Sequence, residues 1–147
     1  MNLQSLIKSV LSKKAYKSLE TDQKEMIQGV VDLSVTNVKE VMVPRIDTIF
    51  VSADTESKEL LERIVESGHT RFPVYEETID KVIGILYVKD VLKSLVNDNF
   101  IDIKKLARKP FFVPESMHID DLLKELRRRK VHIAVVVDEY GGVSGIV

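Results

Sequence analysis

The sequence lacks cysteine and carries almost no net charge, and both features exclude classes of protein. Without cysteine, the 147-residue chain has no disulfide bonds, no thiolate ligands for zinc and no cysteine nucleophile. The same absence fits a reducing cytoplasm, where we expect the protein to be. A net charge of −1 argues against a general nucleic-acid surface, so no nucleic-acid partner is expected.

Long hydrophobic runs are also absent. No apolar stretch approaches the roughly 18 residues that a membrane-spanning helix needs. The N-terminus alternates apolar and polar residues without a continuous apolar core, so we expect no secretory signal. Hydrophobic residues still make up 44% of the chain, which is enough for a core and argues against wholesale disorder. At this length we expect one domain or two small intertwined ones.

No catalytic or metal-binding motif is present. The chain has no Gly-x-Ser-x-Gly, no P-loop, no His-Glu-x-x-His, and no Gly-x-Gly-x-x-Gly after a strand. Its histidines, His69, His118 and His132, lack the spacing of metal ligands. We therefore predict a protein that is not an enzyme, with no catalytic residues and no metal site.

Residues 1–36 are predicted to form a helical leader. Apolar residues recur at helical spacing from Leu3 to Leu11, and a second helix follows, for which Thr21 or Asp22 is the expected cap. A short helical turn capped by Asn37 ends before Pro44. The apolar faces of these helices require a partner. We expect the following domain or a second chain, with a membrane surface as the alternative.

Two copies of one pattern fill the remainder of the chain, in residues 37–99 and 100–147. Leu60, in the helix predicted over residues 55–67, recurs 62 positions later as Leu122, in the helix predicted over 120–130. Gly68 fits the position just beyond the first of these helices. Internal repetition of this kind outranks any single-segment assignment. The remaining predicted elements are strands 49–51, 70–75, 81–86, 111–113, 132–138 and 142–147 and helix 90–96.

The repeat resembles the cystathionine-β-synthase (CBS) domain, which occurs in tandem pairs. The shared pattern is a strand-helix-strand-strand-helix unit ending in Gly-apolar-apolar-x-x-x-Asp, here Gly84 to Asp90. Longer phrases, in residues 41–47, 67–75 and 135–147, are similar to the CorC/TlyC family of magnesium-cobalt efflux and haemolysin-like proteins. The resemblance implies an α+β fold of two β-α-β-β-α repeats packed through their small sheets. We expect the second repeat to be truncated before its last helix.

The resemblance also implies a function. In this family CBS pairs bind adenine nucleotides in clefts between the two copies and regulate a partner domain. We therefore expect a regulatory module linked to magnesium and cobalt transport that binds AMP or ATP, with or without magnesium. The expected partners are a second copy of the chain and, in a longer protein, a membrane transporter domain or a C-terminal CorC domain. The alternative is a dimerisation module that binds no nucleotide.

The resemblance places the nucleotide site in the first copy. Asp90 is expected to accept hydrogen bonds from the ribose hydroxyls, with a plain helix cap as its alternative role. Tyr87 stands where many CBS copies carry a threonine or serine that touches phosphate, so it stacks on the ligand, donates its hydroxyl or fills the cleft. Since the second copy lacks its own acidic residue, we expect at most one usable site, centred on Asp90. The other expected site residues are Ile46, Thr70, Arg71, Phe72 and Pro73, and the second-copy counterparts His132, Ile133 and Ala134.

Overall fold

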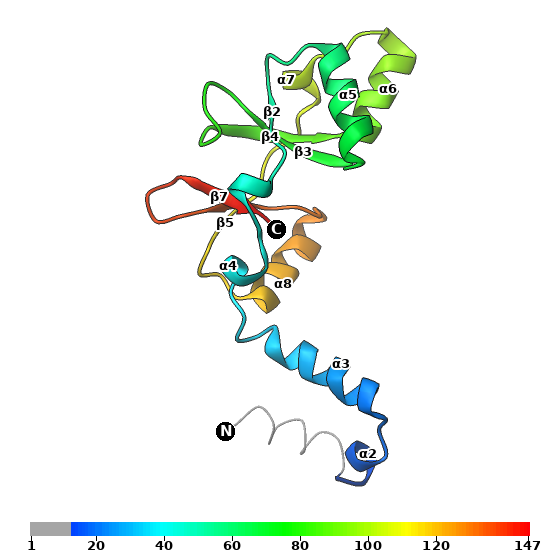
Figure 1. The fold of residues 1–147 in the computed structure, drawn as a ribbon, viewed down its shortest axis with the longest axis vertical. Helices are drawn as coiled ribbons and strands as arrows, with labels where there is room; N and C mark the ends of the chain where they lie inside the picture. The colour runs from blue at the N-terminus through cyan, green and yellow to red at the C-terminus, as the bar shows by residue number, and fades with distance from the viewer. Residues whose placement is uncertain (1–12) are drawn as a thin grey trace.

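The computed structural model describes residues 13–147. The helix predicted around Leu3 to Leu11 lies outside the described residues. Two small units of sheet and helix lie one above the other along the long axis, and the N-terminal helices extend away from them at one end (Figure 1).

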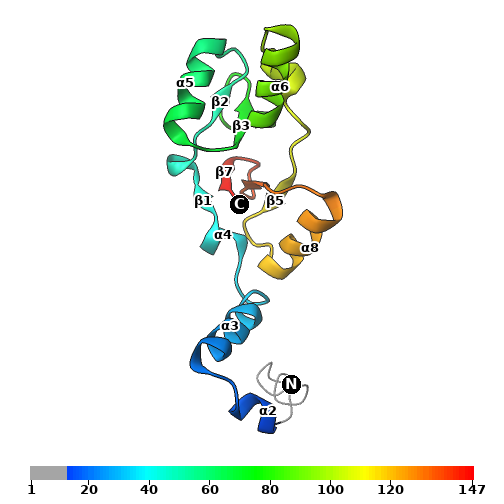
Figure 2. The ribbon, with the colours of Figure 1, turned by 90° about the vertical axis from the view of Figure 1, so that its right-hand side faces the viewer.

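The first unit is a three-stranded sheet with two helices on one face. Strand β2 runs parallel to β3, and β3 pairs antiparallel with β4 in the order β2-β3-β4. Leu60 and Val91, from the two helices, pack with Phe72 and Leu86 of the sheet in one buried cluster. Figures 1 and 2 both show the two helices on the same side of this sheet. The elements are β2 (Val51–Ser52), α5 (Ser57–Ser67), β3 (Arg71–Tyr75), β4 (Val82–Tyr87) and α6 (Val88–Asp98).

The second unit is a four-stranded sheet that includes β1, a strand from the beginning of the first repeat. Its order is β1-β7-β6-β5, so that Val43 pairs with Ile146 near the end of the chain. Val38 is fully buried against Leu122 and Val136 of the second repeat. The two repeats are therefore intertwined through the segment that enters the first one. The elements are α4 (Val38–Val41), β1 (Val43–Pro44), η1 (Arg45–Asp47), β5 (Phe112–Pro114), α8 (Ile119–Arg129), β6 (Val135–Val137) and β7 (Val143–Ile146). Helix α7 (Ile103–Leu106) belongs to the first unit in space, because Ile103 joins the buried cluster around Leu60.

The two sheets meet face to face, as the resemblance implied. Successive strand residues point to opposite faces, so Phe72 faces the helices whereas Ile85 and Tyr87 face the other sheet. There they form a cluster with Ile133 and Val135 of the second repeat. This arrangement confirms the predicted fold of two repeats packed through their small sheets.

Two helix starts differ from the prediction. Helix α3 (Thr21–Asp32) begins after Glu20, which forms a capping box with Gln23, so the predicted caps Thr21 and Asp22 are wrong. Helix α6 begins at Val88 because β4 runs directly into it, and Tyr87 takes the cap position. Asp90 therefore lies within the first turn of the helix and is not its cap.

The described part of the leader makes few contacts with the two units. It comprises α2 (Lys13–Lys17) and α3, and α3 buries none of its side chains. Met26 and Val30 on α3 are 73% and 69% exposed. Packing of α3 side chains on the following domain is not observed, so a second chain stays the prediction, with a membrane surface as its alternative. None of the helices that the structure describes is long and apolar enough to cross a membrane.

Candidate functional site

A cleft lies where the two repeats meet, beside residues 43–49 at the beginning of the first repeat, and we call it the inter-repeat cleft. It encloses about 340 Å³, within the range of small-molecule sites. Four of the predicted site residues line it, Thr70 and Arg71 at the start of β3 and their counterparts His132 and Ile133. Its other lining residues are Val43, Asp47, Thr48, Ile49, His69, Ile146 and Val147.

Arg71 is a charged residue of the cleft, and one of its hydrogen-bond donors has no partner. One terminal nitrogen, Nη1, donates to the Thr70 hydroxyl at 3.2 Å, and the guanidinium carbon lies 5.2 Å from the centre of the Tyr87 ring. The Nε atom is buried and has no hydrogen-bond partner. Because a buried unpaired donor is costly, a shift of this side chain that brings Nε to an acceptor, such as a phosphate oxygen in the cleft, is energetically favourable.

The cleft also contains groups that sequence reasoning missed. Asp47 supplies a carboxylate and His69 an imidazole, while Val43 and Ile146 are brought together by the pairing of β1 with β7. Three of these residues, Val43, Asp47 and His69, lie in the family-like segments 41–47 and 67–75. The resemblance therefore covered them, but it gave them no role in binding. An apolar wall with a cation, a carboxylate and hydroxyls is suited to a nucleoside that carries phosphate.

The remaining predicted base-slot residues do not reach this cleft. Phe72 and Ala134 are fully buried on the helix-facing sides of their sheets, since neighbours along a strand alternate. Pro73 is also fully buried. Ile46 is 90% exposed and lines a different hollow.

Asp90 is separated from the inter-repeat cleft as well. It lines a hollow of about 320 Å³ with residues of α6 and the end of α7. Both of its carboxylate oxygens accept hydrogen bonds from Arg108, at 2.8 Å from Nε and 2.9 Å from Nη2. These bonds lower the pKa of the Asp90 carboxyl and raise that of the Arg108 guanidinium. The expected ribose acceptor thus already has a partner within the chain.

Tyr87 occupies the space next to this ion pair. Its side chain is only 8% exposed and belongs to the cluster between the sheets. The Arg108 guanidinium carbon lies 4.5 Å from the ring centre, and the Lys89 ammonium lies 5.6 Å from it. The Tyr87 ring is therefore packed between the sheets beside the ion pair and attracts cations, and its role toward a nucleotide stays a prediction.

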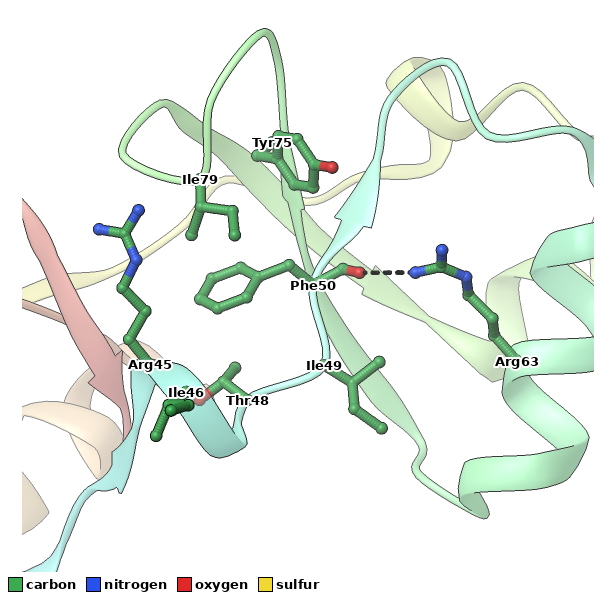
Figure 3. Close-up of a pocket in the computed structure, with 8 residues that line it drawn as sticks. All are labelled: Arg45, Ile46, Thr48, Ile49, Phe50, Arg63, Tyr75 and Ile79. Carbon is green, nitrogen blue, oxygen red and sulfur yellow. Dashed lines mark hydrogen bonds between the residues drawn. The ribbon is translucent and has the colours of Figure 1, made fainter.

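A wider hollow of about 660 Å³ opens beside the β3–β4 hairpin (Figure 3). Phe50, Tyr75 and Ile79 form its apolar part, with Arg45 at one end and Arg63 at the other. Both guanidinium groups are already paired: Arg45 with Asp80, and Arg63 with Glu59 and the Phe50 carbonyl. Its cations are thus less available to an anion than Arg71 is. Within residues 13–147, no group of acidic, histidine or cysteine side chains is arranged to hold a metal ion.

Comparison with known proteins matches the chain to the CBS domain over residues 38–97 and 102–147. Haemolysin C of Brachyspira hyodysenteriae is 38% identical over 88% of this chain and 48% of its own length. The magnesium and cobalt efflux protein CorC of Escherichia coli K12 is 39% identical over 88% of this chain and 44% of its own length. The chain thus spans about half the length or less of these relatives.

Solved structures are similar over nearly the whole chain. The CBS domain of a bacterial Mg²⁺ transporter of the CNNM/CorC family is 34% identical, with a TM-score of 0.88 over 100% of this chain and 90% of that one. A structure of such a domain in complex with ATP is 39% identical, with a TM-score of 0.81 over 86% of this chain and 90% of that one.

Proposed function

Since the chain belongs to the CBS-domain family, as a tandem CBS pair of the CorC and haemolysin-like kind, we propose that it is a regulatory module that binds an adenine nucleotide in the inter-repeat cleft. The observation that carries this proposal is Arg71, which lines a cleft with apolar walls and whose buried Nε has no hydrogen-bond partner. The existence of an ATP complex of a similar domain supports ATP as the first nucleotide to test.

Regulation follows from the position of the cleft between the repeats. Its walls come from β3 of the first repeat, β7 of the second and the segment that enters the first. A nucleotide that fits one relative arrangement of these parts better than another shifts the population toward it by that difference in affinity. We assign residues 1–36 to the leader, 37–99 to the first repeat and 100–147 to the second.

At the level of a longer protein, we propose that the module reports nucleotide binding to a transporter domain or a CorC domain that handles magnesium and cobalt. The module itself is not an enzyme in this proposal and lies in the cytoplasm, at the cytoplasmic face of a membrane protein. Magnesium is tested as a companion of the nucleotide, because phosphates commonly bring it to proteins that supply few ligands of their own.

The test is calorimetric titration of the chain with ATP, AMP and adenosine, with and without magnesium. We expect a Kd between about 10 μM and 1 mM, which corresponds to about 4 to 7 kcal/mol. At 100 times Kd, the ligand adds about 2.7 kcal/mol to the free energy of unfolding and raises the melting temperature. Replacing Arg71 with alanine is expected to weaken ATP binding at least about tenfold, because a charge-assisted bond to phosphate is lost.

Adenosine provides the internal control, because it has no phosphate and its affinity is expected to change little in Arg71→Ala. Lys58→Ala is the matched surface control, since this α5 side chain is 89% exposed. Equal loss of ATP and adenosine binding in Arg71→Ala would remove phosphate from the role assigned to this arginine. Absence of nucleotide binding by a folded chain would refute the proposed function.

A dimerisation module without nucleotide is the second candidate, and exposed apolar side chains favour it. Val65 on α5 and Val96 on α6 are 81% and 85% exposed, and Phe100 beyond α6 is 64% exposed. A second copy of the chain is the occupant that would cover them. Sedimentation and thermal melting together distinguish the two candidates. A chain that sediments as a dimer and whose melting temperature is unchanged by saturating ATP supports this second function.

A further inference from the structure

The position expected to receive a ribose in the first repeat is filled by a side chain of the protein itself. Arg108 follows α7, 18 residues beyond Asp90, and its guanidinium binds both oxygens of the Asp90 carboxylate. The same guanidinium lies over the Tyr87 ring. It therefore satisfies the two features that a nucleoside would use here, a carboxylate for hydroxyl groups and an aromatic face for a planar group.

The backbone of Arg108 is also held by hydrogen bonds. Its amide donates to the Ile85 carbonyl at 2.9 Å, and its carbonyl accepts from the Ile85 amide at 2.8 Å. Residues 107 and 108 thus extend along the edge of β4. Gly84 permits this approach, because a Cβ at that position would lie 2.7 Å from the Ala107 Cβ and 2.8 Å from the Arg108 carbonyl oxygen. These backbone contacts therefore place the Arg108 guanidinium next to Asp90.

We propose that Arg108 is a built-in competitor that keeps nucleotide out of the first repeat, so that the chain binds one nucleotide in the inter-repeat cleft and not a second at Asp90. The proposal extends the proposed function by stating which of the two positions is open. Asp90 keeps its expected role as ribose acceptor only in molecules in which Arg108 has left it.

The strength of this exclusion follows from the fraction of molecules in which Asp90 is free. The apparent affinity of a site falls in proportion to the fraction that is competent to bind. If Asp90 is free in about 1% of molecules, a nucleotide at this position binds about 100-fold more weakly than it does without the arginine. Because Arg108 is on the same chain, dilution does not release it.

The experiment is calorimetric titration with ATP and AMP of the wild-type chain and four variants. Arg108→Ala removes the competitor, and Arg108→Gln does so while keeping most of the side-chain stem in case the alanine variant fails to fold. Lys109→Ala is the matched control, since it removes the same charge one position further along the chain. Arg108→Ala combined with Asp90→Asn removes the carboxylate that the new site needs.

We expect one nucleotide for the wild type and Lys109→Ala, two for Arg108→Ala or Arg108→Gln, and one again for the double variant. A stoichiometry that stays unchanged in folded Arg108→Ala and Arg108→Gln, or a wild type that binds two, overturns the inference. The outcome also separates the two proposals. If the wild type binds none and Arg108→Ala gains one Asp90-dependent site, the inference holds while nucleotide binding in the inter-repeat cleft is refuted.

Discussion

At the residue scale, one glycine has a role that its neighbours in the sequence do not reveal. Gly84 lies in β4, where the family pattern Gly-apolar-apolar-x-x-x-Asp begins. The segment that carries Arg108 crosses it closely enough that any side chain there would collide with backbone atoms. The first residue of the pattern thus holds the segment that supplies a partner to Asp90, its last residue.

Gly84→Ala tests this close approach. We expect the substitution to lower the free energy of unfolding by about 1 to 3 kcal/mol, because the added methyl group overpacks a contact with backbone atoms. Gly29→Ala is the control: its Cβ would meet nothing within 4 Å in the middle of α3. That change should stabilise the helix by about 0.5 to 1 kcal/mol. Denaturant unfolding measures both, and a neutral Gly84→Ala would contradict the close approach.

At the scale of elements, the two corresponding helices of the repeats end differently. Helix α5 ends at Gly68, which adopts a left-handed conformation with φ of 66°, as its sequence position predicted. Helix α8 ends at Lys130 with φ of 55°, a conformation that costs a residue with a side chain more than it costs glycine. The second repeat thus retains the backbone of this helix end without the residue best suited to it.

Lys130→Gly is expected to stabilise the protein by about 1 kcal/mol, because glycine adopts the left-handed conformation without the steric cost. Gly68→Ala is the reciprocal change, and it should destabilise the protein by a similar amount. A Cβ at Gly68 would have open space around it, so that the cost comes from the backbone alone. Thermal and denaturant unfolding report both changes. If both substitutions changed the free energy of unfolding in the same direction, this explanation would be contradicted.

At the scale of the whole molecule, a polar contact joins the hairpins of the two repeats. The Asp80 carboxylate, in the β3–β4 turn, accepts hydrogen bonds from the Val143 amide at 3.0 Å and from Arg45 at 2.6 Å. Arg45 also donates to the Val143 carbonyl at 3.2 Å. These bonds, the one from Val143 first, lower the pKa of the Asp80 carboxyl. The ionised carboxylate thus links three segments that are distant in the sequence.

Asp80→Asn should lower the melting temperature at pH 7, and this difference should shrink in acid. A carboxyl with a lowered pKa in the folded state stabilises the protein above its ordinary pKa near about 4 and loses that contribution as the pH falls through the folded-state value. Melting curves between pH 7 and pH 3 measure the difference from the wild type. Asp54→Asn is the control, since Asp54 is 82% exposed and its contact with Lys104 is 3.8 Å long. A difference independent of pH would show that the charge of Asp80 is not what links the repeats.

Part of the candidate site could be predicted from the sequence. Thr70, Arg71, His132 and Ile133 were predicted from the repeat and its resemblance, and the structure gathers them around one cleft. Phe72 and Ala134 stand beside them in the sequence but point to the opposite faces of their strands. Assigning a side chain to the cleft requires knowing which face of each sheet meets the other, and the pattern of apolar residues on both faces did not decide this.

The repeat, the fold class and the approximate positions of most helices and strands can be predicted from the chain's local patterns, because apolar periodicity and turn residues act over a few neighbouring positions. The pairing of Val43 with Ile146 and the binding of Asp90 by Arg108 are evident only in the folded chain. Those contacts depend on which distant segments meet across a sheet edge. Many segments of similar composition are equally able to form such contacts until the two sheets have packed.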